Sequence, residues 1–168
     1  PAVLRDDCGA DPARRWKMWF VGKSSLADFS IGLAYSPEGV NWTQAPGNPI
    51  FTAADDPDAW DGSNVFAPSV RQSACNSFQM WYGAKGDLLQ IGFATSSDGI
   101  HWNRHPNNPV LRAGVLNQWD NGEITDAGII TVVDGATGRT GVVDATQGLV
   151  GSQNGDMTTW AYKGEMFS

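Results

Sequence analysis

Short runs of apolar residues, separated by clusters of turn-forming residues, follow one another along most of the chain. Phe66–Arg71, Phe78–Gly83 and Gln90–Ser96 are three such runs, and each is bounded by Gly, Ser or Asn. Runs of about four to eight residues with these boundaries, rich in β-branched and aromatic side chains, are typical of β-strands. Few segments have the spacing of an amphipathic helix, so the pattern predicts an all-β protein.

The chain also repeats itself, which indicates a fold built from copies of one unit. The segment Ile31–Trp42 returns sixty residues later as Ile91–Trp102. Trp60-Asp61 returns as Trp119-Asp120, so each unit is about sixty residues long. The residues that recur at a spacing of sixty are Gly32, Ala34, Ser36, Gly39, Trp42, Pro46, Asn48 and Pro49, which return as Gly92, Ala94, Ser96, Gly99, Trp102, Pro106, Asn108 and Pro109.

Each unit is predicted to contain four strands. Glu38-Gly39 and Asp98-Gly99 suit a tight hairpin turn, because Gly readily adopts a positive φ. A short fourth strand, ending at Trp42 or at Trp102, would then fold back on the third strand. Four antiparallel strands per repeat are typical of a β-propeller blade.

A third unit is fainter than the first two. It is expected to hold a β-branched first strand, a turn, second and third strands and the beginning of a fourth strand. These predicted elements are Ile124–Val133, Asp134–Gly138, Thr140–Thr146, Met157–Tyr162 and Met166-Phe167. The sequence therefore predicts a partial β-propeller domain over residues 1–168, made of about three four-stranded blades at about 1–59, 60–118 and 119–168.

Three blades form an incomplete ring, and an open propeller leaves apolar faces and sheet edges in water. Two explanations stay open. A homodimer could complete a six-bladed ring, or missing residues of a longer chain could complete a five-bladed one. Of the two, we favour closure by oligomerisation.

The composition agrees with an all-β fold and disfavours two classes of binding partner. The chain is 41% hydrophobic and contains 8 Trp and 20 Gly, which combines large core side chains with many tight turns. The formal net charge is -7 and the sequence has no local basic patch, so the chain would repel a phosphate backbone and binding to nucleic acid is disfavoured. No apolar run is long enough to span a bilayer, so we expect no membrane partner.

The cysteines and the beginning of the chain leave the compartment open. Cys8 and Cys75 occupy equivalent places in the repeat, which suggests a shared turn position as readily as a disulfide. The chain begins at Pro1, with no initiator Met and no signal peptide, as a processed or truncated chain would. A secreted or periplasmic location is compatible with these features.

Four strings in the sequence carry a resemblance to a known family. Trp60–Val70, Met80–Tyr82, Ile91–Trp102 and Pro106–Val110 resemble the five-bladed β-propeller glycosidase superfamily, which includes arabinanases, β-xylosidases, levansucrases, invertases and the related mannoside phosphorylases. The resemblance covers residues 1 to 130. It implies three acidic residues on three blades, which act as nucleophile or base, as proton donor and as modulator. Cleavage of a glycosidic bond does require paired carboxylates.

In many members of this superfamily the acid precedes the Pro of the first strand. The equivalent places here lie just before Pro1, at Ala67 and at Asp126. Asp126 is therefore the first catalytic candidate, although it could instead cap its strand. Glu123 is the second candidate, as a proton donor whose pKa is raised by burial, or else a solvated loop residue.

Two Trp-Asp pairs could bind substrate. Trp60-Asp61 and Trp119-Asp120 precede the first strands, and a Trp beside an acid suits a sugar, which stacks on indole and donates hydrogen bonds to carboxylate. Because the pair repeats, a structural role is favoured: Trp packing between blades and Asp fixing the turn. No metal or cofactor is expected, since His101 and His105 have no further ligands at useful spacing.

The sequence thus predicts a carbohydrate-active propeller, a glycoside hydrolase or part of one, that acts on oligosaccharides with carboxylates at the channel mouth. The alternative is a sugar-binding or scaffolding propeller that has lost its catalytic acids. Ala67 supports the alternative, because it stands where an acid is expected.

Overall fold

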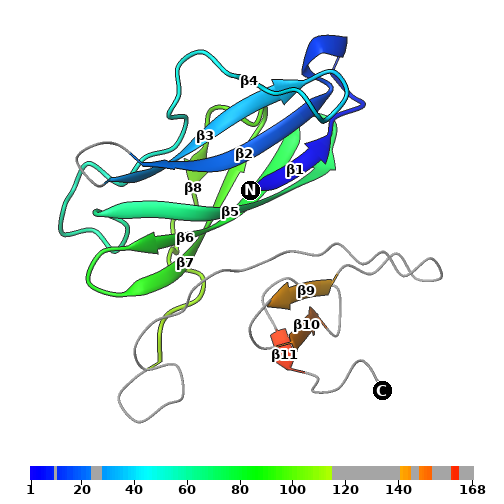
Figure 1. The fold of residues 1–168 in the computed structure, drawn as a ribbon. Helices are drawn as coiled ribbons and strands as arrows, with labels where there is room; N and C mark the ends of the chain where they lie inside the picture. The colour runs from blue at the N-terminus through cyan, green and yellow to red at the C-terminus, as the bar shows by residue number, and fades with distance from the viewer. Residues whose placement is uncertain (10, 24–27, 115–140, 145–147, 153–159, 163–168) are drawn as a thin grey trace. The chain divides into compact units, whose positions relative to one another are not determined.

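The computed structural model describes residues 1–9, 11–23, 28–114, 141–144, 148–152 and 160–162 (Figure 1). The chain divides into two compact units, Pro1–Thr125 and Asp126–Ser168. The described residues of the second unit form a three-stranded antiparallel sheet in the order β11-β10-β9. Its strands are β9 (Gly141–Asp144), β10 (Gly148–Ser152) and β11 (Trp160–Tyr162).

The first unit contains two four-stranded antiparallel sheets, each with its strands in sequence order. The first sheet consists of β1 (Ala2–Arg5), β2 (Trp16–Lys23), β3 (Phe29–Ser36) and β4 (Thr43–Gln44), with the short 3-10 helix η1 (Pro12–Arg14) between β1 and β2. The second sheet consists of β5 (Asn64–Ala74), β6 (Ser77–Lys85), β7 (Leu89–Ser96) and β8 (Asn103–Arg104). The prediction of an all-β chain with four-stranded repeats in this part is confirmed. Among the described residues, no helix has the length and apolar character needed to cross a membrane.

The structure corrects the predicted ends of the fourth strands and adds one strand that was not predicted. The fourth strands begin after Trp42 and Trp102 instead of ending there, because the preceding residues form a wide turn closed by a serine hydroxyl. In each sheet the Oγ of Ser36 or Ser96 accepts the N–H of the turn glycine at 2.8 Å. In the second unit, β10 lies between the predicted strands Thr140–Thr146 and Met157–Tyr162. The sequence did not predict β10, because its apolar run is short and lies beside two glycines.

An asparagine closes the outer edge of each sheet. Asn48 Oδ1 accepts the N–H of Leu33 and its Nδ2 donates to the carbonyl of Leu33, both at 2.9 Å. Asn108 makes the same pair of bonds with Phe93, at 2.9 and 3.0 Å. The side-chain amide therefore replaces a partner strand where the short β4 and β8 end, which explains why this asparagine recurs in the sequence.

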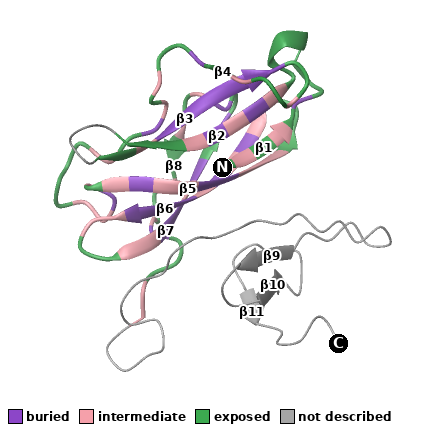
Figure 2. Ribbon diagram, viewed as in Figure 1, coloured by how far each residue is buried: buried purple, intermediate pink, exposed green. Residues whose placement is uncertain are grey.

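The core lies between the two sheets (Figure 2). We call the face of each sheet that carries Trp19 or Trp81 its back face, and the opposite face its front face. The back face of the first sheet packs on the front face of the second, where Trp19 is fully buried against Phe78, with ring centroids 6.1 Å apart. The indole N–H of Trp19 donates to the carbonyl of Gly99 at 2.9 Å. Burial of an aromatic side chain of this size contributes about 2–3 kcal/mol, so Trp19 anchors this interface.

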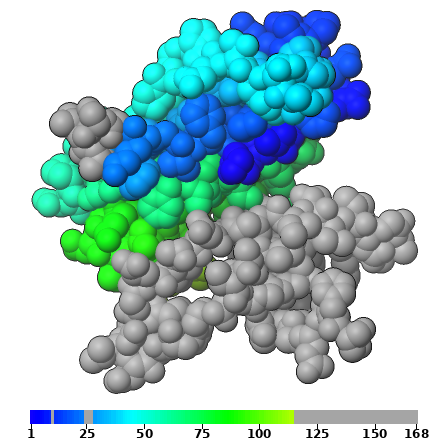
Figure 3. All heavy atoms as spheres, in the orientation of Figure 1, coloured from blue at the N-terminus to red at the C-terminus, as the bar shows by residue number. Residues whose placement is uncertain are grey.

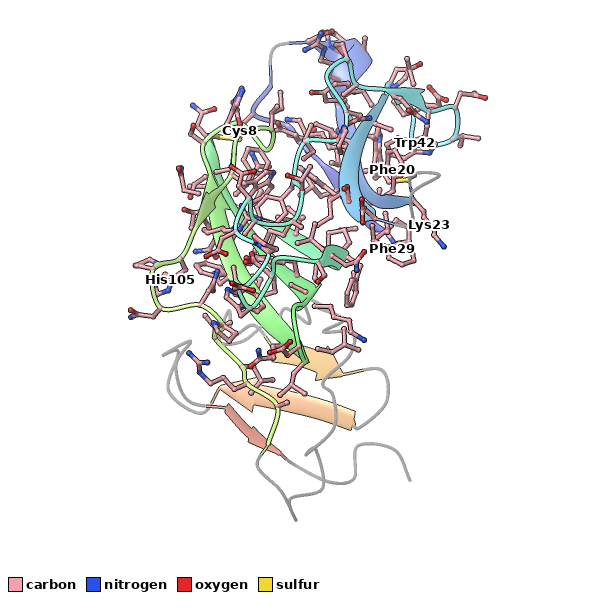
Figure 4. All side chains as sticks on the ribbon, turned by 90° about the vertical axis from the view of Figure 1, so that its left-hand side faces the viewer. Cys8, Phe20, Lys23, Phe29, Trp42 and His105 are labelled. Carbon is pink, nitrogen blue, oxygen red and sulfur yellow. A yellow bond between two sulfur atoms is a disulfide. The ribbon has the colours of Figure 1, made fainter. Side chains whose placement is uncertain are left out.

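Polar and covalent links join the same two sheets at one end. The buried carboxylate of Asp6 accepts hydrogen bonds from Lys17 of β2 and from Gln72 of β5, the latter at 3.0 Å. A disulfide connects Cys8 to Cys75 and closes a sequence separation of 67 residues (Figure 4). The sequence left this bond open, and the structure shows that the two turns meet because the sheets pack face to back.

Candidate functional site

The first strand of the second sheet has an irregular beginning. The pairing of β5 with β6 shifts register between Phe66 and Ser69, and Ala67 has a φ of 47°. This φ belongs to the left-handed region, which a non-glycine residue rarely occupies and which costs about 1–3 kcal/mol. Ala67 is the position at which the resemblance placed an acid, and this strained position carries a methyl group.

A shallow groove includes Phe66, the residue before Ala67, in its lining. Its volume is about 370 Å³, and its walls come from the ends of β2 and β6 and the beginnings of β3, β5 and β7. The N–H of Phe29 donates to Asn64 Oδ1 at 2.8 Å and fixes one wall to the other. The groove is lined by Val21, Phe29, Asn64, Phe66, Lys85 and Leu89.

The groove depends on one glycine. A Cβ at Gly83 would lie 2.6 Å from the ring of Phe66, so only glycine lets this ring lie flat on β6. The two phenylalanine rings and the aliphatic side chains make the lining apolar, which suits the apolar face of a sugar ring or of an attached aryl group. Sequence reasoning missed Phe29 and Phe66 as site residues, since no spacing in the repeat brings them together.

Asp61 is buried, with 2% of the residue exposed. Its Oδ2 accepts hydrogen bonds from Arg104 Nε at 2.7 Å and from the hydroxyl of Tyr82 at 3.2 Å. Arg104 also donates to the carbonyl of Thr52 at 2.6 Å and lies 4.3 Å from the ring centroid of Phe51. Burial, followed by the neighbouring Asp61 carboxylate, raises the pKa of Tyr82.

Both hydrogen-bond partners of this carboxylate belong to the second sheet, and Arg104 in turn connects that sheet to Thr52, in the segment after β4. Trp60 packs on Tyr82, with ring centroids 5.8 Å apart, and a Cβ at Gly92 would lie 2.6 Å from its indole. The structural interpretation of the Trp-Asp pair, with Trp between blades and Asp fixing the turn, stays a prediction. The other predicted site residues, Trp119, Asp120, Glu123 and Asp126, lie outside the described residues.

The two histidines make local contacts. His101 Nδ1 lies 2.7 Å from Asp98 Oδ2, while the ring of His105 lies 5.9 Å from that of Phe93. Burial alone would raise the pKa of Asp98, but hydrogen bonds from His101, Ile100 and Ser96 hold it well below its ordinary value. Within the described ranges, no group of three or more His, Cys, Asp or Glu side chains is arranged to hold a metal ion.

Comparison with known proteins relates this fold to carbohydrate enzymes. A repeat of unknown function (DUF5650) matches residues 115–160. No curated protein sequence matches the chain. The similar solved structures are propeller glycosidases.

One of these structures represents family 130 of the mannoside phosphorylases, which contains glycoside hydrolases that target β-1,2 mannosidic linkages in Candida mannan. Its sequence is 16% identical to this chain and its TM-score is 0.65. The match covers 96% of this chain and 47% of the other chain. A presumed glycoside hydrolase from Parabacteroides distasonis is 18% identical to this chain, with a TM-score of 0.61. The match covers 95% of this chain and 48% of the hydrolase.

A family 117 glycoside hydrolase from Zobellia galactanivorans is 16% identical to this chain, with a TM-score of 0.51. The match covers 68% of this chain and 33% of the hydrolase. The chain thus spans about half or less of these relatives. At such identities the likeness shows the fold.

Proposed function

We propose that this chain is a carbohydrate-active β-propeller of the five-bladed glycosidase kind, a glycoside hydrolase or part of one, that acts on oligosaccharides. The observation that carries the proposal is the shared architecture: two glycosidase-related structures match 95% and 96% of the chain. Fold alone does not imply activity, so the site must supply the rest of the argument.

The site that supports the proposal lies at the beginning of β5. In a propeller the first strands line the central channel, so Ala67 and the groove that includes Phe66 would face the substrate. The rings of Phe29 and Phe66 offer the apolar surface on which sugars stack. Asp126, as nucleophile or base, and Glu123, as proton donor, are the residues that we propose for bond cleavage.

A second candidate function is sugar binding without cleavage. Ala67 favours it, because this strained position carries a methyl group where the resemblance implies a carboxylate. Asp61, the described acid nearest to Ala67 in the sequence, is buried and held by Arg104 and Tyr82 of the second sheet.

Turnover of aryl glycosides separates the two functions. The chain is tested on aryl arabinofuranoside, xyloside, fructoside and mannoside, together with Asp126→Asn and the exposed control Asp58→Asn. For an enzyme, Asp126→Asn should lower kcat by at least about 100-fold, while Asp58→Asn should leave it unchanged. Sugar binding without turnover, equal in wild type and Asp126→Asn, would reject the hydrolase and support the binding function.

A further inference from the structure

The disulfide and the buried carboxylate that join the two sheets have a residue in common. Cys8 forms the disulfide with Cys75, and its backbone N–H donates to Asp6 Oδ1 at 3.0 Å. The same oxygen accepts the side-chain amide of Gln72 at 3.0 Å, and the other carboxylate oxygen accepts Lys17. The N-terminal segment that carries Asp6 and Cys8 (dark blue in Figure 3) lies against β5. Both sheets therefore contribute to one cluster.

These bonds close a small ring. Asp6 precedes Cys8 by two residues, and Gln72 precedes Cys75 by three. The disulfide closes one side of the ring and the hydrogen bond from Gln72 to Asp6 closes the other. A covalent link only a few residues away raises the effective concentration of the amide at the carboxylate. This hydrogen bond should therefore depend on the disulfide more strongly than contacts elsewhere between the sheets do.

We propose that Asp6, Lys17, Gln72 and the Cys8–Cys75 disulfide act as one latch between the two sheets, which responds both to redox state and to pH. Reduction of the disulfide by a dithiol loosens the hold of Gln72 on Asp6. Protonation of Asp6 loosens the same bonds and makes the disulfide easier to reduce. The two effects are linked, because coupling between two sites is reciprocal. The latch is independent of the proposed enzymatic activity.

The redox step needs a dithiol as its co-reactant. One thiolate of the dithiol attacks a sulfur of the disulfide and forms a mixed disulfide, and the second thiol of the dithiol then displaces the protein. The S–S bond between Cys8 and Cys75 breaks, and the two cysteines gain two electrons and two protons. The reductant is oxidised to a cyclic disulfide, so the step is balanced.

The charges around the carboxylate make its ionisation matter. Among the described residues, the charged group in contact with Asp6 is Lys17 of β2, whose Nζ also lies 5.1 Å from the ring centroid of Phe78 on β6. β5 contributes a neutral amide. Arg5 and Asp7, on either side of Asp6 in the sequence, pair with each other at 2.9 Å at the surface. Protonation of Asp6 therefore leaves Lys17 without its counter-ion in a largely buried place, which is costly.

The direction of the pH effect follows from these contacts. Burial alone would raise the pKa of Asp6, but hydrogen bonds from Lys17, Gln72 and Cys8 hold it below its ordinary value. Without the disulfide, the bond from Gln72 loosens while the burial remains, so the pKa of Asp6 rises. The stability that a lowered pKa provides is lost as pH falls through the pKa of the folded state. The disulfide-free protein should therefore lose this contribution at a higher pH than the wild type.

Nuclear magnetic resonance titration of the Asp6 carboxyl carbon measures the coupling. In Cys8→Ser with Cys75→Ser, the pKa of Asp6 should lie at least about half a unit above the wild-type value, which corresponds to a threefold change in proton affinity. Gln72→Ala, with the disulfide intact, should raise this pKa too. Ser73→Ala, at an exposed position of the same strand, is the matched control and should leave it unchanged. A pKa of Asp6 that is equal with and without the disulfide overturns the proposal.

The reduction equilibrium at pH 7 tests the reciprocal effect and uses proteins that retain both cysteines. Each protein is equilibrated in mixtures of reduced and oxidised dithiothreitol, and its free thiols are counted by alkylation and mass spectrometry. Gln72→Ala and Asp6→Asn should each raise the equilibrium constant for reduction at least about threefold. Asn108→Ala controls for a general loss of stability, since its partners Phe93 and Tyr82 lie in the second sheet, and should not raise this constant.

The reduction equilibrium decides the proposal in either direction. An increase for Asn108→Ala as large as that for Gln72→Ala and Asp6→Asn overturns it, because reduction would then follow overall stability and not the latch. Constants for Gln72→Ala and Asp6→Asn that equal the wild-type value overturn it as well. Sugar turnover enters neither measurement, so these outcomes are separate from the fate of the proposed function.

Discussion

At the scale of single residues, Ala67 is held in a conformation that its side chain disfavours. Replacement by glycine removes this strain, and we expect Ala67→Gly to raise the free energy of unfolding by about 0.5–1 kcal/mol. Ala67→Val should lower it by about 2 kcal/mol, because a β-branched side chain fits the left-handed region worst. Urea unfolding measures both. A destabilising glycine would mean that the register shift of β5 requires the methyl group of Ala67.

Asp6 makes the stability of the protein depend on pH. Burial alone would raise its pKa, but hydrogen bonds from Lys17, Gln72 and the N–H of Cys8 lower it below the ordinary value. A lowered pKa gives stability that is complete above the pKa of the unfolded chain and is lost as pH falls through the pKa of the folded state.

Asp6→Asn should therefore lower the free energy of unfolding by about 3 kcal/mol at neutral pH, since it leaves Lys17 buried without its partner. The difference from wild type should shrink as the pH is lowered below 4. Asp7→Asn, at an exposed position, is the control and should change stability by less than about 0.5 kcal/mol. A difference that stays constant down to acid pH would contradict this assignment.

At the scale of the strands, the sequence predicted most of the sheets because the same signals occur twice. Gly39 and Gly99 marked the hairpins, and the long strands carried the alternation of apolar residues. The strands that prediction misplaced are the two-residue strands β4 and β8, which follow a turn closed by a serine hydroxyl and precede an asparagine that completes the edge of β3 or β7. β10 was missed because glycine-rich segments resemble turns.

The asparagine that completes each edge should be costly to remove. Asn108 exchanges two hydrogen bonds with the backbone of Phe93 and donates to the hydroxyl of Tyr82 at 3.2 Å. Asn108→Ala should lower the free energy of unfolding by about 2–3 kcal/mol, since these groups lose their partners. Asn107→Ala, in the same turn, should cost less than about 0.5 kcal/mol. Equal effects of the two substitutions in thermal unfolding would contradict the edge-closing role.

At the scale of the whole molecule, the sequence predicted that sheets would repeat but not which side chains distant in the sequence would meet. Asp61 could bind sugar or fix a turn as long as its partners were unknown, and only packing brings Arg104 to it from a position 43 residues later. The groove lined by Phe29 and Phe66 arises in the same way, from strand ends that have no common motif. Contacts between sheets depend on three-dimensional packing, whereas spacing reports on single strands.

The Cys8–Cys75 disulfide is the covalent counterpart of these contacts, and its removal should reveal how far the two sheets depend on it. Closing 67 residues restricts the unfolded chain, so Cys8→Ser with Cys75→Ser should lower the free energy of unfolding by about 4 kcal/mol. Reduction of the wild type should cause the same loss, while a reductant should leave the double variant unchanged. Because Trp19 and the Asp6 pair hold the interface as well, the variant should still unfold in one transition. Separate transitions monitored by tryptophan fluorescence and by circular dichroism would show instead that the disulfide is what makes the two sheets one cooperative unit.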